Sequence, residues 1–312
     1  MNDSKEFSFS NMADNFDDHI TRSIPSYDVL RDLIYELCKF YVLLRDDKKL
    51  PYTILDIGCS QGTMIRRIWE WYNEEPNPLK YKCIGVDINE DFKQHWKDET
   101  SKKGATLNYH IGNILHEDAK YGLQNPLQNQ ILQGERLGFA YSLFTTQFLI
   151  GEKRKLFNII RRRLILGGCF VVCEKIKLDT PIKKRQSDLH QIWKHKKGGF
   201  SQTEVMQKER ALKEITEYHT EQELLDMLGK TKDGCQFECE TIWKTHNFIA
   251  IQCIKDDPFP VEMSFKERKK GLKEFKKKML DAENIINEEK RNILRESLVT
   301  QILGKVKGWM KD

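Results

Sequence analysis

The sequence predicts an α/β protein built on a Rossmann-like, seven-stranded, mostly parallel sheet with helices on both faces. Five short apolar runs, each ending near a polar residue or a glycine, alternate with longer segments of helical spacing. Strands that alternate with helices indicate a parallel sheet covered on both sides. Two further apolar runs, separated by only three residues near the end of this region, are typical of a closing antiparallel hairpin.

The elements follow one another in a regular order. The expected strands are 53–58, 82–87, 106–112, 137–142, 167–175 and, in the hairpin, 237–243 and 247–254. Helices are expected at 64–72 and 153–164, and apolar residues at helical spacing before the first strand predict an N-terminal helical cap over 1–50, interrupted by Pro25. The Rossmann-like domain is expected over 51–255, with a helical insertion at about 180–228. An apolar stripe at helical spacing predicts a basic helical C-terminal extension over 256–312.

The composition narrows the class of protein. The 312-residue chain is 39% hydrophobic and 32% charged, and no run approaches the roughly 20 apolar residues that cross a bilayer. The acidic, polar start does not resemble a signal or transit peptide. Eight cysteines without a dense framework favour free thiols in a reducing compartment, and the pairs Cys169/Cys173 and Cys235/Cys239 lack the CxxC spacing of zinc sites. We therefore expect a cytoplasmic protein with no membrane span and no metal.

Positive charge is concentrated in the C-terminal extension. Residues 264–312 carry 14 Lys and Arg against 8 Asp and Glu, whereas the rest of the chain carries 38 against 39. The extension is expected to dock on its own domain or on a second subunit, with RNA, an acidic membrane or another protein as the alternative partner. The basic run 153–164 is expected to be a solvated helix face, and the alternative is a path for RNA phosphates.

The end of the first strand carries the clearest indication of function. The stretch TILDIGCSQGTM (53–64) ends its apolar run at Asp56 and continues through Gly58, Cys59, Ser60 and Gly62 into a helix. In an open parallel sheet, ligands bind outside the carboxyl ends of the strands, where the strand order reverses. A loop of small residues lets a ligand approach the backbone. An acid at its start disfavours a phosphate and suits a cationic group.

The second strand ends in another acid. Asp87, followed by Ile88, lies about 30 residues farther along, where a carboxylate can accept hydrogen bonds from both ribose hydroxyls. A nucleoside with an amino-acid tail and a cationic group fits these two acids, and S-adenosyl-L-methionine is such a ligand. A nicotinamide dinucleotide fits less well, because the third glycine of its GxGxxG loop is absent after Gly62. The sequence thus predicts an S-adenosyl-L-methionine site.

The same segments resemble class I S-adenosylmethionine-dependent methyltransferases and, among them, the carboxy-S-adenosylmethionine synthases. The resemblance runs in order from about residue 15 to 254, and its most specific pieces are RSIPSYD and GFSQTEVMQK. That family supplies the carboxymethyl donor for wobble-uridine modification in bacterial tRNA and completes its site with a second subunit. The resemblance therefore implies tRNA modification, a homodimer, and S-adenosyl-L-methionine or carboxy-S-adenosyl-L-methionine as the bound nucleoside.

The resemblance also assigns residues to the site. It implies that Tyr27 approaches the sulfonium and that Asn113 and Ile114 lie beside the adenine. The position of the family's carboxylate-binding arginine is Glu209 here, with Arg210 one residue later, and Leu143 stands where the family has an asparagine. The full set of expected cofactor-binding residues is Asp56, Gly58, Cys59, Ser60, Gly62, Asp87, Ile88, Asn113, Ile114 and Leu143.

Three functions remain open at this point. The first is methyl transfer to an unidentified acceptor, with Tyr27, Arg22 and Arg210 as the catalytic candidates. The second is synthesis of carboxy-S-adenosyl-L-methionine from S-adenosyl-L-methionine and prephenate, for which Arg22 and Arg210 are the available carboxylate-binding cations. The third is a cofactor-binding subunit that docks a protein or a nucleic acid through its tail.

Overall fold

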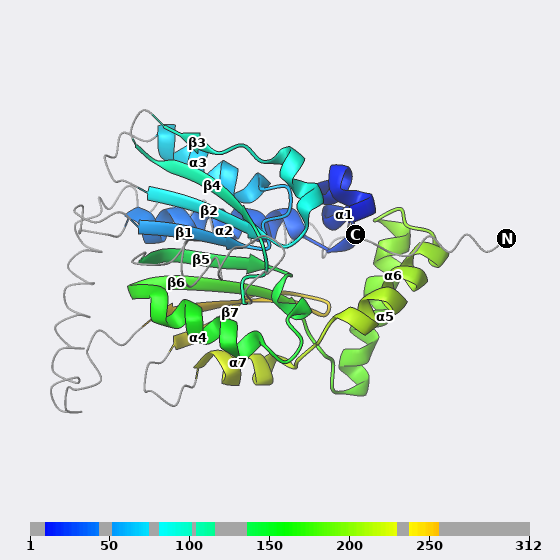
Figure 1. The fold of residues 1–312 in the computed structure, drawn as a ribbon. Coiled ribbons are helices and arrows are strands. Elements are labelled where there is room, and N and C mark those ends of the chain that lie inside the picture. Colours follow the sequence, from blue (N-terminus) through cyan, green and yellow to red (C-terminus); the bar gives the residue numbers. More distant parts are fainter. Residues whose placement is uncertain are drawn as a thin grey trace, which may run out of the picture.

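The computed structural model describes residues 10–43, 52–74, 81–101, 104–115, 136–229 and 237–255. These ranges form an eight-stranded sheet in the order β3-β4-β2-β1-β5-β6-β8-β7 (Figure 1). The strands are β1 (Tyr52–Ile57), β2 (Tyr81–Asp87), β3 (Glu99–Thr100), β4 (Thr106–Ile111), β5 (Leu137–Leu143), β6 (Leu164–Lys175), β7 (Phe237–Thr245) and β8 (Phe248–Lys255).

The predicted Rossmann-like sheet is confirmed. Parallel pairing joins β4, β2, β1, β5 and β6, while β8 runs antiparallel between β6 and β7. The seven expected strands are present. The additional strand, β3, pairs antiparallel with β4 and has two residues, which is too short for any periodic pattern in the sequence.

The strand order reverses beside β1. From β1 the chain adds β2 and β4 on one side and then returns to the other side of β1 to add β5 and β6. Helix α3 (Thr63–Glu74), which follows β1, and helix α4 (Lys153–Arg163), which follows β5, pack on opposite faces of the sheet. This reversal is the position at which open α/β sheets bind ligands, at the carboxyl ends of the strands.

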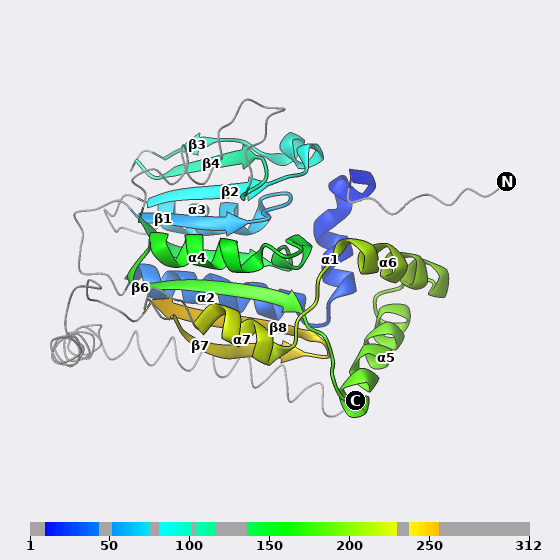
Figure 2. The same ribbon diagram turned by 60° about the horizontal axis from the view of Figure 1, so that its bottom comes forward.

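Both faces of the sheet are buried by helices. The face helices are α2 (Tyr27–Leu43) and α3 (Thr63–Glu74) on one side and α4 (Lys153–Arg163) and α7 (Glu221–Gly229) on the other. Figure 2 shows α4 in front of the sheet and α2 behind it. In β1, Ile54 packs with Leu30 and Ile65 of α2 and α3, whereas the next residue, Leu55, packs with Phe157 of α4. This alternation follows from the two-residue period of a strand.

Three further helices lie beyond the carboxyl ends of the strands. They are α1 (Phe16–Ser23), α5 (Pro181–Lys196) and α6 (Gln202–Ile215), and Figure 1 shows them grouped at the arrowhead end of the sheet. The chain leaves α1 just before Pro25, which has no N–H to continue a helix. A capping box starts α6, because the Ser201 hydroxyl accepts the Glu204 N–H while the Glu204 carboxylate accepts the Ser201 N–H.

The expected insertion at 180–228 contains two kinds of helix. Helices α5 and α6 lie off the end of the sheet, whereas α7 packs on its face because Leu224, Met227 and Leu228 are buried there. The expected C-terminal extension over 256–312 lies outside the described residues. Within the ranges that the structure describes, every helix is too short or too polar to cross a membrane.

Candidate functional site

A cavity of about 400 Å³ lies where the strand order reverses. Its walls come from the carboxyl ends of β1, β2, β5 and β6, from α1 and α2, and from α5 and α6. The predicted site residues that line it are Tyr27, Asp56, Gly58, Cys59, Ser60, Asp87, Ile88, Asn113, Ile114 and Leu143. The fold therefore brings residues from distant parts of the sequence to one cavity at the end of the sheet where ligands are expected.

Asp56 lies near the end of β1 and is 2% exposed. The Tyr141 hydroxyl donates a 2.8 Å hydrogen bond to Asp56 Oδ2. Burial raises the pKa of Asp56 to about 8; the Tyr141 hydrogen bond opposes this rise, and the nearby carboxyls of Asp87 and Asp17 add to it. The positive charge of Arg31, which also lines the cavity, lowers the pKa of Asp56. A cationic group bound beside Asp56 would favour its charged form.

Asp87 ends β2 and holds the loop that follows β1. Its Oδ2 accepts the Ser60 N–H at 2.8 Å and its Oδ1 accepts the Asn89 N–H at 2.9 Å. Burial raises the pKa of Asp87, and these backbone donors lower it. A carboxylate can accept about four hydrogen bonds, so the backbone donors Ser60, Asn89 and Ile88 still leave acceptor capacity for a ligand hydroxyl.

The two loop glycines serve different purposes. Gly58 lines the cavity at a φ of +77°, and a Cβ there would lie 1.9 Å from Thr145 Oγ1, so only glycine fits. The Gly58 N–H donates to Val86 O at 2.7 Å and ties the loop to β2. Gly62 does not line the cavity; a Cβ on it would lie 2.5 Å from the Tyr109 ring. This close approach requires a glycine at position 62, and its role in holding the cofactor remains a prediction.

Apolar residues after β2 and β4 form the next part of the wall. Ile88 is 65% exposed although it is apolar, and Ile114 and Phe92 are buried. The side-chain oxygen of Asn113 accepts the Leu115 N–H at 2.9 Å. Apolar surfaces with one amide among them are suited to a flat heterocyclic base.

The three predicted catalytic residues do not lie together. Tyr27 lines the cavity, and burial raises the pKa of its hydroxyl. Arg22 and Arg210 do not line it, and their catalytic roles remain predictions. Arg22 Nε donates to Gly198 O at 2.8 Å, which directs this side chain toward the loop between α5 and α6. Arg210 is exposed on α6, two residues beyond Lys208 and thus about 200° around the helix from it.

Sequence reasoning missed the cations that do line the cavity. They are Arg31, Lys175, Lys194 and Lys208. Burial first, and the charges of neighbouring lysines second, lower the pKa of Lys194 to about 8 and that of Lys208 to about 7. The three lysines come from β6, α5 and α6, so no spacing in the sequence joins them. Two signals were available: Lys175 lies at a strand end, and Lys208 is the last residue of the motif GFSQTEVMQK.

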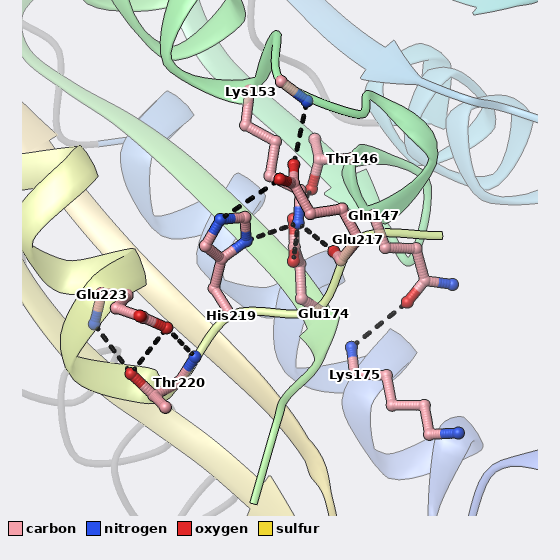
Figure 3. A network of polar contacts seen from close by, with 10 residues as sticks. Thr146, Gln147, Lys153, Glu174, Lys175, Glu217, His219, Thr220 and Glu223 are labelled. Carbon is pink, nitrogen blue, oxygen red and sulfur yellow. Dashed lines mark hydrogen bonds and ion pairs between the residues drawn. The ribbon is translucent and has the colours of Figure 1, made fainter. Parts of the chain in front are cut away.

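A buried ion pair supports the cavity rim. Lys153 Nζ lies 2.7 Å from Glu174 Oε2, and both side chains are 1% exposed. The same ammonium donates to Glu217 O at 2.6 Å and lies 3.1 Å from His219 Nδ1 (Figure 3). The Thr146 hydroxyl donates to the second Glu174 oxygen. This network ties the turn after β5 and the segment before α7 to β6.

Helix α4 differs from the solvated basic face expected over 153–164. Lys153 and Arg161 are each 1% exposed. Arg161 Nη2 donates to Leu228 O, and its guanidinium carbon lies 4.8 Å from the centre of the Phe237 ring. These charges are buried because β6, α7 and β7 provide partners that lie far away in the sequence. The prediction is wrong for these two residues.

The cavity is bipolar. Acidic residues line it near β1 and β2, together with Arg31 of α2, and lysines line it near β6, α5 and α6. The acidic members are Asp17, Asp56 and Asp87, and the basic members opposite are Lys175, Lys194 and Lys208. Such an arrangement can hold a cationic nucleoside on one side and an anionic group on the other.

Comparisons with known proteins agree with this architecture. No protein-family model matches the chain. It is 27% identical over 257 residues to the carboxy-S-adenosyl-L-methionine synthase of Nitratiruptor sp., covering 80% of this chain and 94% of that protein. It is 28% identical over 259 residues to the same enzyme of Campylobacter curvus, covering 80% and 95%. The chain is similar to the carboxy-S-adenosyl-L-methionine synthases. The resemblance predicted from the sequence is thus confirmed.

A solved structure also resembles the chain. A SAM-dependent methyltransferase from Aquifex aeolicus is 12% identical, with a TM-score of 0.42, over 80% of this chain and 99% of that one.

Proposed function

We propose that this protein is an S-adenosyl-L-methionine-dependent transferase and that the cavity binds S-adenosyl-L-methionine. The observation that carries the proposal is the pair of acids, Asp56 and Asp87, at neighbouring strand ends on one wall of a 400 Å³ cavity. A diphosphate would be repelled there, whereas a nucleoside with an ammonium group is attracted. The names of the relatives support the same ligand.

The proposed contacts follow the chemistry of the lining. Asp87 would accept the ribose hydroxyls through its remaining acceptor positions. Ile88, Asn113 and Ile114 would flank the adenine. Asp56 would face the cationic part of the amino-acid tail. Cys59, Ser60 and Leu143 complete the proposed contact set.

The first candidate reaction is methyl transfer. The sulfonium of the ligand supplies an activated methyl group, and the protein contributes position and a site from which water is excluded. Tyr27 and Phe144, with ring centroids 6.2 Å apart, line the same wall and are both buried. Tyr27 is therefore the residue proposed to flank the group that is transferred.

The second candidate is carboxy-S-adenosyl-L-methionine synthesis with prephenate as co-substrate. Glu209, at the position of the family's arginine, is exposed, and its carboxylate accepts a 2.6 Å hydrogen bond from Gln191 Nε2. It does not line the cavity, so it does not place a negative charge against a bound carboxylate. The positive charge that the family draws from arginine is supplied here by lysines of the cavity. This observation favours an anionic group close to the nucleoside.

Calorimetric titration tests the ligand assignment. The wild-type chain is expected to bind S-adenosyl-L-methionine and S-adenosyl-L-homocysteine. Asp87→Ala is expected to weaken both by about tenfold or more, because hydrogen bonds to a charged acceptor are lost. Asp91→Ala, an exposed acid on the following 3-10 helix η2 (Glu90–His95), is the matched control. No binding by the wild type ends the proposal, and unchanged binding by Asp87→Ala removes that residue from the site.

Product analysis separates the two reactions. Incubation with S-adenosyl-L-methionine and prephenate, followed by mass spectrometry, is expected to give a nucleoside heavier by one carboxyl group if the second candidate holds. Intact binding without this product leaves methyl transfer. A role in tRNA modification follows only from the carboxylated product.

Three wider assignments belong to the same proposal. We propose a cytoplasmic homodimer whose site a second subunit completes, and a protein or RNA partner for residues 264–312. Analytical ultracentrifugation tests the dimer, and truncation before Ser264 tests the extension. If the protein instead acts as a cofactor-binding subunit, truncation abolishes its biological activity while Asp87→Ala leaves that activity intact.

A further inference from the structure

We infer that Cys239 of β7 and Cys253 of β8 form a redox-sensitive thiol pair, which a peroxide converts into a reversible disulfide between the two strands. The two strands form the antiparallel hairpin at one edge of the sheet, next to α7 (Figure 2). Neither cysteine lines the cavity, so the inference is independent of the reaction proposed for the cavity.

The two cysteines lie directly opposite each other. Cys239 pairs with Cys253 in the register of β7 and β8, so both side chains lie on the same face of the sheet. Their Sγ atoms are 3.3 Å apart. Residues paired across antiparallel strands have Cα atoms about 4.5–5.5 Å apart, a separation that a disulfide can span. Because the S–S bond is about 2 Å long, the two sulfur atoms need to approach each other by only about 1 Å.

The two thiols differ in their access to solvent. Cys253 is fully buried among the apolar residues under α4 and α7, whereas Cys239 is partly exposed at the margin of the same cluster. The other cysteines that the structure describes are all buried. A small oxidant in solution therefore reaches Cys239 first, and Cys253 lies behind it as the second thiol.

Neighbouring groups favour the thiolate form of Cys239. Its pKa is lowered first by the hydrogen bond with Cys253, because the Cys253 thiol can donate to a thiolate. Burial and the Glu238 charge oppose this shift, and the charge of Arg161 adds to it. The guanidinium carbon of Arg161 lies 4.8 Å from the centre of the Phe237 ring, two residues before Cys239 on the same strand. A cation is thus fixed close to the partly exposed thiol.

Cys253 has the opposite character. Burial raises the pKa of this thiol well above its usual range, and the hydrogen bond with Cys239 raises it further. The thiolate is the nucleophile in thiol chemistry. Cys239 is therefore the thiol that attacks the oxidant, and Cys253 is the thiol that resolves the product.

The oxidation proceeds in two steps with hydrogen peroxide as the oxidant. The Cys239 thiolate attacks one peroxide oxygen, the O–O bond breaks, and hydroxide leaves and takes up a proton as water, so that Cys239 becomes a sulfenic acid. The Cys253 sulfur then attacks the Cys239 sulfur, and the S–O bond breaks as the S–S bond forms. The second hydroxide leaves with the Cys253 proton as water. The two thiols lose two electrons, and the peroxide gains them.

Strand geometry makes this disulfide readily reducible. Paired residues have Cβ atoms about 4.5–5.5 Å apart, which is wider than the roughly 3.5–4.5 Å of a relaxed disulfide. A disulfide under strain is more easily reduced by a thiol. In a reducing compartment the pair therefore rests as two thiols and forms the disulfide only under oxidation.

Peptide mapping of the full wild-type chain tests the inference. The reduced, folded chain is treated with hydrogen peroxide, its remaining thiols are alkylated, and trypsin then releases peptides 233–244 and 245–255. We expect these two peptides to be joined, with a mass lower by two hydrogen atoms than their sum, and to separate after dithiothreitol is added. Peptide 233–244 also contains Cys235, which lies outside the described residues, and a second cleavage after Glu238 separates it from Cys239. A link through Cys235, or sulfinic acid on Cys239 without any link to Cys253, would overturn the inference.

Variants assign the two roles. Cys239→Ser should abolish the link, whereas Cys253→Ser should stop the oxidation at a sulfenic acid on Cys239 that dimedone traps. Cys235→Ser, in the same tryptic peptide, is the matched control and should form the link as the wild type does. Dimedone labelling of Cys253 in Cys239→Ser at the rate found for Cys239 in Cys253→Ser would contradict the assigned roles.

Native alkylation gives a measurement that needs no variant. Iodoacetamide should modify Cys239 of the reduced, folded chain about tenfold or more faster than the buried Cys83, whose pKa burial raises. Equal rates at the two residues would show that Cys239 lacks the access and the thiolate character on which the inference depends.

Discussion

Replacing the buried Lys153 of α4 with methionine should lower the free energy of unfolding more than most single substitutions in this helix. The substitution leaves the Glu174 carboxylate buried, at 1% exposure, without its ammonium partner. Removing one member of a buried ion pair costs about 3–5 kcal/mol, because the remaining charge stays desolvated. For a domain of this size, that corresponds to a fall in Tm of about 6–20 °C. Thermal unfolding followed by circular dichroism measures it.

A matched change on the same helix gives the control. Lys155 forms an exposed ion pair with Glu152 at 3.6 Å, and exposed pairs contribute about 0–1 kcal/mol. Lys155→Met should therefore shift Tm by only a few degrees. The double variant Lys153→Met/Glu174→Met removes both buried charges and should recover most of the loss, which a double-mutant cycle quantifies. A loss below about 1 kcal/mol in Lys153→Met, or no recovery in the double variant, would refute this reasoning.

Further predictions concern the cavity. Gly58→Ala places a Cβ 1.9 Å from Thr145 Oγ1 at a positive φ, so calorimetry should show no binding of S-adenosyl-L-homocysteine. The double variant Gly58→Ala/Thr145→Ser keeps the clashing hydroxyl and should not restore binding. The pKa of Asp56 is raised to about 8 in the folded, ligand-free protein, so the folded protein binds a proton at this carboxyl more tightly than the unfolded chain does. The contribution of Asp56 to the free energy of unfolding should therefore fall as the pH rises from about 4 to about 8. A cationic ligand needs the charged form, so S-adenosyl-L-methionine affinity should rise up to about tenfold per pH unit between pH 6 and 8, and Asp56→Asn should flatten this profile; a flat wild-type profile contradicts it. The pKa of Lys208 is lowered to about 7 in the folded protein, so between pH 7 and 10.5 the unfolded chain binds more protons at this residue than the folded protein does. The free energy of unfolding should therefore rise with pH over that range. Lys208→Met should therefore raise Tm more at pH 6.5 than at pH 9.5, and an equal shift at both would contradict it.

Local patterns were enough to predict the sheet and its acidic wall. Asp56 and Asp87 each follow an unbroken run of apolar residues, which identifies a strand from local sequence alone. Because the two strands are parallel neighbours, their carboxyl ends lie at the same edge of the sheet. The predicted nucleoside contacts at Ile88, Asn113 and Leu143 accordingly line the cavity. Their assignment as ligand contacts remains a prediction.

The lysines that line the cavity, Lys175, Lys194 and Lys208, could not be predicted in the same way. Arg22 opens the motif RSIPSYD and Arg210 follows GFSQTEVMQK by two residues, yet neither lines the cavity. Lys194 and Lys208 belong to helices joined by a short loop, and which faces of these helices line the cavity depends on packing against α1. The same holds for Lys153 and Arg161, whose burial depends on partners in β6 and α7.

By itself, the sequence determined the parallel sheet, the glycine bend after β1 and the two acids at adjoining strand ends, because each depends on residues close together in the chain. Only the tertiary structure decided that Arg31 and three lysines, and not Arg22 or Arg210, line the cavity with these acids, and that Glu209 does not line it. The physical reason is that the direction of a side chain on a helix is set by how the helix packs, and one residue more rotates it by about 100°.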